Sequence, residues 1–88
     1  MTSHDDMNLQ LQAAVGVAYM AVQIAEIAEY EAYVEAQVVA RAVARDSADE
    51  VARAHYDESV AALLGALMET ASAIEAYIAA CRALEESK

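Results

Sequence analysis

The pattern of apolar positions predicts one long helix in the first half of the chain. Between residues 14 and 39, apolar side chains recur at alternating spacings of three and four, which places them on one side of an α-helix. Two such stripes run along this segment. The bulky stripe consists of Val17, Met20, Ile24, Ile27, Glu31, Val34 and Val38, with Glu31 as its polar member. The alanine stripe consists of Ala14, Ala18, Ala21, Ala25, Ala28 and Ala32.

The two stripes lie about 100° apart around an ideal helix, so this helix has two adjacent packing faces. A helix with two such faces needs two neighbours, as a helix in a four-helix bundle has. We expect the helix to run from about residue 7 to residue 45. Arg41 and Arg45 near its end suit the negative pole of the helix dipole.

The second half of the chain predicts another helix, from about residue 48 to residue 86. A heptad pattern of apolar residues marks its expected packing seam: Val60, Leu64, Leu67, Ala71, Ile74, Ile78 and Cys81. The opposite face is rich in alanine, and we expect it to be exposed to solvent, since alanine is a strong helix former. A second contact in a larger assembly is the alternative for that face.

The junction between the two helices has a helix-start signal but no Gly or Pro. Ser47-Ala48-Asp49-Glu50 has the form of a capping box, and the phase of the apolar stripe slips by one residue there. A turn at this point would place residue i beside residue 95 − i. Bulky residues would then meet inside the hairpin, and the alanine stripe would be left for a second hairpin. One continuous helix is the alternative.

Length and composition favour association between chains. The 88 residues form one expected domain, residues 1–88, without Pro, Phe or Trp. A domain of this size buries too little surface to be more than marginally stable alone. Cys81 is the single cysteine, so no intramolecular disulfide can support the fold, and a lone thiol suits a reducing compartment. We therefore expect a cytoplasmic homo-oligomer, with a dimer as the first expectation.

The formal charge of −10 restricts the partners. Direct binding of nucleic acid or of an anionic membrane surface needs Lys and Arg, which are scarce here. A basic protein surface is the complementary partner. Residues 7–25 carry no charge, which is long enough for a membrane span, but four amide side chains lie among them and no basic cluster flanks them. The acidic N-terminus does not resemble a signal peptide, so neither a leader nor a membrane span is expected.

An acidic cluster is the strongest candidate for chemistry: Glu26, Glu29, Glu31 and Glu35. Its Glu26-Ile27-Ala28-Glu29 segment resembles the Glu-x-x-Glu of the all-α nucleoside-triphosphate pyrophosphohydrolases, and Asp57-Glu58 resembles their second acidic pair. The resemblance implies a magnesium-dependent enzyme, but the downstream Glu-x-x-Asp of that family is missing. A metal site of the Glu-x-x-His type is also missing. We expect a solvated acidic face, with no catalytic residues, metal or cofactor.

Three functional hypotheses follow. The first is a non-enzymatic helical hairpin that self-associates through the alanine stripe into an antiparallel four-helix bundle and acts as scaffold, adaptor or complex subunit. The second is an acidic inhibitor or decoy that binds a basic protein surface in place of nucleic acid. The third is a magnesium-dependent all-α enzyme built on Glu26, Glu29 and Glu58.

Overall fold

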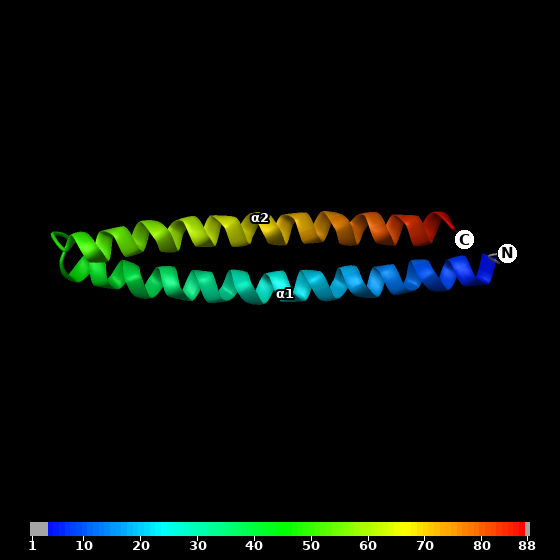
Figure 1. Ribbon diagram of the computed structural model, residues 1–88, viewed down its shortest axis with the longest axis horizontal. Helices are drawn as coiled ribbons and strands as arrows, with labels where there is room; N and C mark the ends of the chain where they lie inside the picture. The colour runs from blue at the N-terminus through cyan, green and yellow to red at the C-terminus, as the bar shows by residue number, and fades with distance from the viewer. Residues whose placement is uncertain (1–3, 88) are drawn as a thin grey trace.

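The computed structural model describes residues 4–87 and consists of two long antiparallel helices joined by one tight turn (Figure 1). Helix α1 spans His4–Arg45 and helix α2 spans Glu50–Glu86. The hairpin measures 67 × 18 × 13 Å, and its two ends lie side by side at the open end. The prediction of an all-helical hairpin is confirmed, and the alternative of one continuous helix is wrong.

Two aspartates build the turn that the sequence left without Gly or Pro. The Asp46 carboxylate accepts a hydrogen bond from the Ala48 amide at 3.1 Å, and the Asp49 amide donates to the Asp46 carbonyl at 3.2 Å. Asp49 then caps α2, because its carboxylate accepts from the amides of Val51 at 3.0 Å and Ala52 at 3.1 Å. The helix break therefore depends on aspartate side chains that replace backbone partners.

The predicted capping box at Ser47 is wrong by two residues. Asp49 has extended backbone angles, φ −72° and ψ 102°, so it cannot belong to a first helical turn that begins after Ser47. Glu50 is consequently the first helical residue, and it does not reach back to a Ser47 cap. Aspartate is favoured at the cap position because its carboxylate accepts hydrogen bonds from the backbone amides of both Val51 and Ala52.

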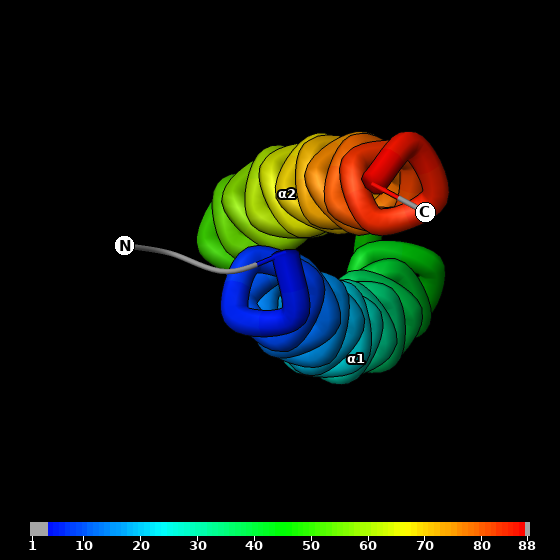
Figure 2. The backbone as a smooth tube through the Cα atoms, turned by 90° about the vertical axis from the view of Figure 1, so that its right-hand side faces the viewer, coloured from blue at the N-terminus to red at the C-terminus, as the bar shows by residue number. Residues whose placement is uncertain are grey.

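The helices wind around one another, as the view along the hairpin shows (Figure 2). The residues of the seam between them recur with heptad spacing. The α1 side of this seam consists of residues that are buried or half-buried: Asn8, Leu11, Val15, Ala18, Val22, Ala25, Glu29, Ala32, Ala36, Val39 and Val43. The α2 side consists of Ala52, Tyr56, Ser59, Leu63, Ala66, Thr70, Ala73, Tyr77, Ala80, Leu84 and Ser87, of which Tyr56 is the most exposed.

Small residues lie opposite larger ones in most layers of the seam. The predicted register, residue i beside 95 − i, is confirmed at the open end, where Asn8 Nδ2 lies 3.5 Å from Ser87 Oγ. In this register Val22 shares a layer with Ala73, and Ala18 shares one with Tyr77, whose ring lies 5.7 Å from that of Tyr19. Such alternation lets the two helices approach closely, because each large side chain finds room over a small one.

The core inside the seam is thin. Among residues 4–87 the buried hydrophobic side chains are Val22, Ala36 and Val39, and none of the described side chains is buried completely. Two polar residues are also buried in the seam, and each bonds to its own helix. Ser59 Oγ donates to the His55 carbonyl at 2.9 Å, and Thr70 Oγ1 donates to the Ala66 carbonyl at 3.0 Å.

The prediction of which face packs inside the hairpin is wrong. The bulky stripe of α1 was expected against α2, but Val17 is 70% exposed and Ile24 is 66% exposed. Most of the predicted α2 seam is also exposed, with Leu64 56% exposed, although Val60 and Cys81 are half-buried. Half of the supposed solvent face of α2, including Ala66, lies in the seam instead. Small residues allow a closer approach than two bulky stripes would, and the bulky side chains are thereby left on the surface.

We expect Asp49→Ala to lower the free energy of unfolding by about 1 kcal/mol, because two amides at the start of α2 lose their acceptor. Urea unfolding followed by circular dichroism, at a fixed protein concentration, measures this. The matched control is Ser47→Ala, which should change stability by less than about 0.5 kcal/mol. A larger loss for Ser47→Ala than for Asp49→Ala would contradict the observed cap.

We expect Ala36→Leu to destabilise the hairpin by about 1–3 kcal/mol, because the larger side chain enters a buried position opposite Ser59. Thermal unfolding measures the effect. Ala61→Leu is the control, since Ala61 is exposed on α2 and carries the same change in volume. Equal melting temperatures for the two variants would mean that Ala36 does not lie in a packed seam.

Candidate interaction surfaces

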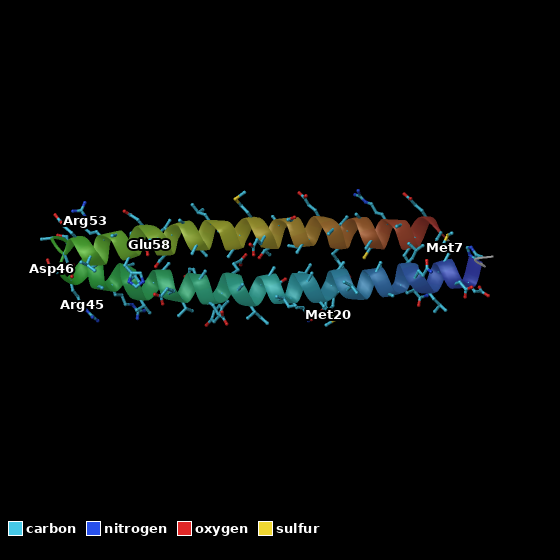
Figure 3. The ribbon with its side chains drawn as sticks, in the orientation of Figure 1. Met7, Met20, Arg45, Asp46, Arg53 and Glu58 are labelled. Carbon is cyan, nitrogen blue, oxygen red and sulfur yellow. The ribbon has the colours of Figure 1, made fainter. Side chains whose placement is uncertain are left out.

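The bulky stripe of α1 lies on the side of the helix that faces away from α2, and we call it the outer stripe. On an ideal helix its mean direction is about 160° from that of the seam. Figure 3 shows Met20 on this side, and Arg45 lies on the same side near the turn. The six apolar members of the stripe are between 40% and 70% exposed. The hairpin itself therefore gives these side chains no partner helix.

The bulky stripe of α2 lies beside the seam, and we call it the side stripe: Val60, Leu64, Leu67, Ala71, Ile74, Ile78 and Cys81. Its mean direction is about 100° from the seam on an ideal helix. Leu67, Ile74 and Ile78 are each between 40% and 44% exposed. The hairpin thus carries two apolar surfaces that point in different directions, one on each helix.

The six residues of the alanine stripe are divided between two environments. Ala18, Ala25 and Ala32 are half-buried in the seam with α2, where the register sets them opposite larger or polar residues. The remaining three alanines, Ala14, Ala21 and Ala28, are exposed beside the seam. The role of the whole stripe in a contact between chains stays a prediction, and half of the stripe already packs inside the hairpin.

The candidate carboxylates do not converge on one point. Within residues 4–87 no group of three or more His, Cys, Asp or Glu side chains is arranged to hold a metal ion. Glu58 lies on α2 beside position 37 in the hairpin register, more than two helical turns from Glu29. The three residues of the magnesium-enzyme hypothesis are therefore not assembled by this hairpin.

One carboxylate of the cluster makes an ion pair that the sequence interpretation missed. His55 Nε2 lies 3.1 Å from Glu35 Oε1, although the hairpin register places His55 beside position 40 and not beside Glu35. Both side chains are long enough to span the distance along α1 between position 40, which lies beside His55, and Glu35. Both are more than half exposed, so the pair contributes little to stability.

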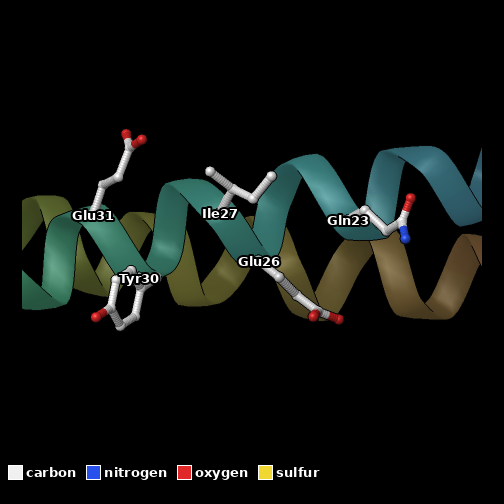
Figure 4. Close-up of a pocket in the computed structure, with 5 residues that line it drawn as sticks. All are labelled: Gln23, Glu26, Ile27, Tyr30 and Glu31. Atoms are coloured by element: carbon white, nitrogen blue, oxygen red, sulfur yellow. The ribbon is translucent and has the colours of Figure 1, made fainter.

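Three surface depressions are each lined by residues of one helix. One of them is lined by Gln23, Glu26, Ile27, Tyr30 and Glu31, all on α1, with α2 lying behind that helix (Figure 4). Ile27 and Tyr30 are 60% and 67% exposed, so the depression is an open part of the surface. A small-molecule site normally encloses most of its ligand. This depression therefore fits a docking surface better than an active site.

The environment of Cys81 does not suit a nucleophile. A hydrogen bond with Cys81 raises the pKa of the Tyr77 hydroxyl above its ordinary range, with the charge of the thiolate acting in the same direction. The phenol therefore stays protonated at neutral pH. Activation of a cysteine needs a base or a positive charge beside the thiol, whereas the hydrogen-bond partner of this thiol is a neutral phenol. Cys81 is half-buried at the side stripe, not at the seam where it was expected.

Both helices are long and apolar enough to cross a membrane by composition alone. The most apolar window of α1 has a mean hydropathy of 1.4 and that of α2 has 1.3. Only 6% and 11% of these windows are buried in the hairpin, so their hydropathy is not explained by a core. The windows show how much apolar surface the hairpin leaves uncovered.

The chain has no detectable relatives in three comparisons. No known protein family, no curated protein and no solved structure matches it.

We expect magnesium to leave the hairpin unchanged, because its carboxylates are dispersed over the surface. Thermal unfolding in 10 mM MgCl2 should match that in NaCl of equal ionic strength to within about 1 °C. A ligand that binds only the folded state raises its stability in proportion to the logarithm of its concentration. A saturable rise of several degrees, lost in Glu26→Gln, would contradict this expectation.

Proposed function

We propose that this chain is a non-enzymatic helical hairpin that self-associates and serves as a scaffold, adaptor or subunit of a larger complex. The supporting observation is the imbalance between core and surface. The described part of the chain buries three hydrophobic residues, whereas eighteen large hydrophobic residues are exposed. A monomer with this distribution gains little from burial and presents a surface that associates with another apolar surface.

A second copy of the chain suits this surface because the hairpin has no other means of support. Small domains without disulfides or metals depend on oligomerisation when their core is thin. Two hairpins that cover each other's outer stripe would form an assembly of four helices. We expect the cytoplasm as its compartment, since the lone Cys81 thiol suits a reducing environment.

Charge supports a different candidate, the acidic decoy. The formal charge of −10 is large for 88 residues and would attract a basic protein surface. Such a complex would weaken as salt screens the charges. An apolar contact between two copies would persist or strengthen, since salt does not weaken hydrophobic association. Salt dependence therefore separates the two functions.

We expect light scattering after gel filtration to give at least twice the chain mass of 9.4 kDa, both at 50 mM and at 500 mM NaCl. The reason is that burial of the exposed bulky residues stabilises the oligomer at any salt concentration. A helical species of 9.4 kDa at both concentrations would contradict self-association.

A further inference from the structure

We propose that a second copy of this chain docks on the outer stripe of α1, with the two α1 helices antiparallel. This inference rests on the proposed self-association and adds its surface and geometry. The two-fold axis passes between Ile24 and Ile27, so that Ile24 of one copy faces Ile27 of the second copy. The four helices then follow one another as α2, α1, α1 and α2, because the outer stripe lies opposite the seam.

The spacing of the outer stripe is self-complementary in this arrangement. When Ile24 faces Ile27 of the second copy, Val17 faces Val34 and Ala13 faces Val38. Each of these three layers therefore joins two apolar residues, and each is repeated by the two-fold axis, as an interface between identical surfaces requires. The two-fold axis lies within about one residue of the middle of His4–Arg45, so nearly all of α1 overlaps.

Glu31 has a defined place in this contact. It falls opposite Met20 of the second copy, and both residues are exposed on the free hairpin. The flexible side chain of Met20 can pack against the methylene groups of Glu31 while the carboxylate stays in water. The polar member of the stripe is thus accommodated without burial of a charge.

Charge complementarity selects the antiparallel orientation. The first turn of α1 carries Asp5 and Asp6, and its last turn carries Arg45. In the antiparallel register, Asp6 of one copy lies beside Arg45 of the second copy, and this pairing occurs at both ends. A parallel pair would place acid beside acid at one end and arginine beside arginine at the other, which is repulsive.

The side stripe of α2 does not have this complementarity. The next position of this stripe before Val60 is Asp57, near the turn. The next position after Cys81 is Glu85, near the open end. An antiparallel α2 pair would therefore set carboxylate beside carboxylate at both ends. The first turn of α2 is acidic, and no basic residue lies in its last turn. The outer stripe of α1 is the better surface for a second copy.

The available area is sufficient for a specific contact. A strip of α1 about 60 Å long and about 10 Å wide amounts to roughly 600 Å² on each copy. The total of about 1,200 Å² lies at the lower end of stable specific interfaces. The apolar side chains already on this strip mean that the contact removes little polar surface from water.

Disulfide trapping tests the orientation. Ala13→Cys and Val38→Cys are made separately in a Cys81→Ser background, and one of them carries a tag that changes its mass. When the two are mixed and oxidised, the inference predicts the mixed disulfide between Cys at 13 and Cys at 38. Two copies of position 13 would be on the order of 35–40 Å apart in the antiparallel pair. Disulfides formed mainly between identical positions would overturn the inference. A yield of the mixed disulfide no higher than the yield of disulfide dimer from the control Ala61→Cys on α2 would also overturn it.

A substitution pair tests the surface. Ile24→Glu with Ile27→Glu should raise the dissociation constant of the dimer at least about 100-fold, since four carboxylates would enter the contact. Met68→Glu on α2 is the control, because Met68 is 73% exposed and lies outside both stripes. Circular dichroism at high protein concentration checks that each variant still forms helix.

The outcomes separate this inference from the proposed function. If the wild-type chain is dimeric and the Ile24/Ile27 variant remains equally dimeric, the second copy docks elsewhere, and self-association still stands. If the wild-type chain is a monomer at every concentration, both fail. If it is a monomer in buffer but partitions onto neutral phosphatidylcholine vesicles, the outer stripe contacts lipid, and the docking of a second copy is overturned.

Discussion

The close approach of α1 and α2 along a seam of mostly small residues is the constraint on which the rest of the hairpin depends. Ala36 lies opposite Ser59, and Ala25 lies opposite Thr70, whose hydroxyl is bonded within its own helix. Helices joined in this way can lie close together, but each layer removes little apolar surface from water. The seam therefore determines the register and shape of the hairpin more than it determines its stability.

A narrow seam leaves the bulky side chains outside, and the proposed self-association depends on them. Ile24 and Ile27 on α1, and Leu64 and Leu67 on α2, would form the core of a conventional hairpin. Here they form two surfaces that only another molecule can cover. The absence of a convergent carboxylate set among residues 4–87, together with depressions formed by single helices, gives no comparable support to chemistry.

The sequence predicts the helices and their register well, because heptad spacing and the acidic turn are local features. The ends at Arg45 and Glu86 and the register of Asn8 with Ser87 agree with expectation. The choice of packing face was not predictable from apolar spacing. The bulky and small stripes share the same spacing, and which of them packs inside depends on how closely the helices approach, a property of both helices together.

The candidate site follows the same division between local and tertiary features. The apolar stripe around Ile24 was visible as a pattern, but its exposure became evident only with the seam in place. The pair of Glu35 with His55 was missed because side-chain reach is not contained in a register of Cα positions. The acidic first turn and basic last turn of α1 were readable from the sequence, and their significance for a second copy depends on the outward direction of the stripe.

A hairpin with so thin a core should need a second copy to be stable, and the concentration dependence of its folding shows whether it does. Thermal unfolding is followed by circular dichroism over a 100-fold range of protein concentration. Because association and folding are coupled in such a dimer, the account predicts a melting temperature that falls steadily on dilution. A melting temperature that stays constant over the whole range would show that the single hairpin is stable alone and would contradict the account.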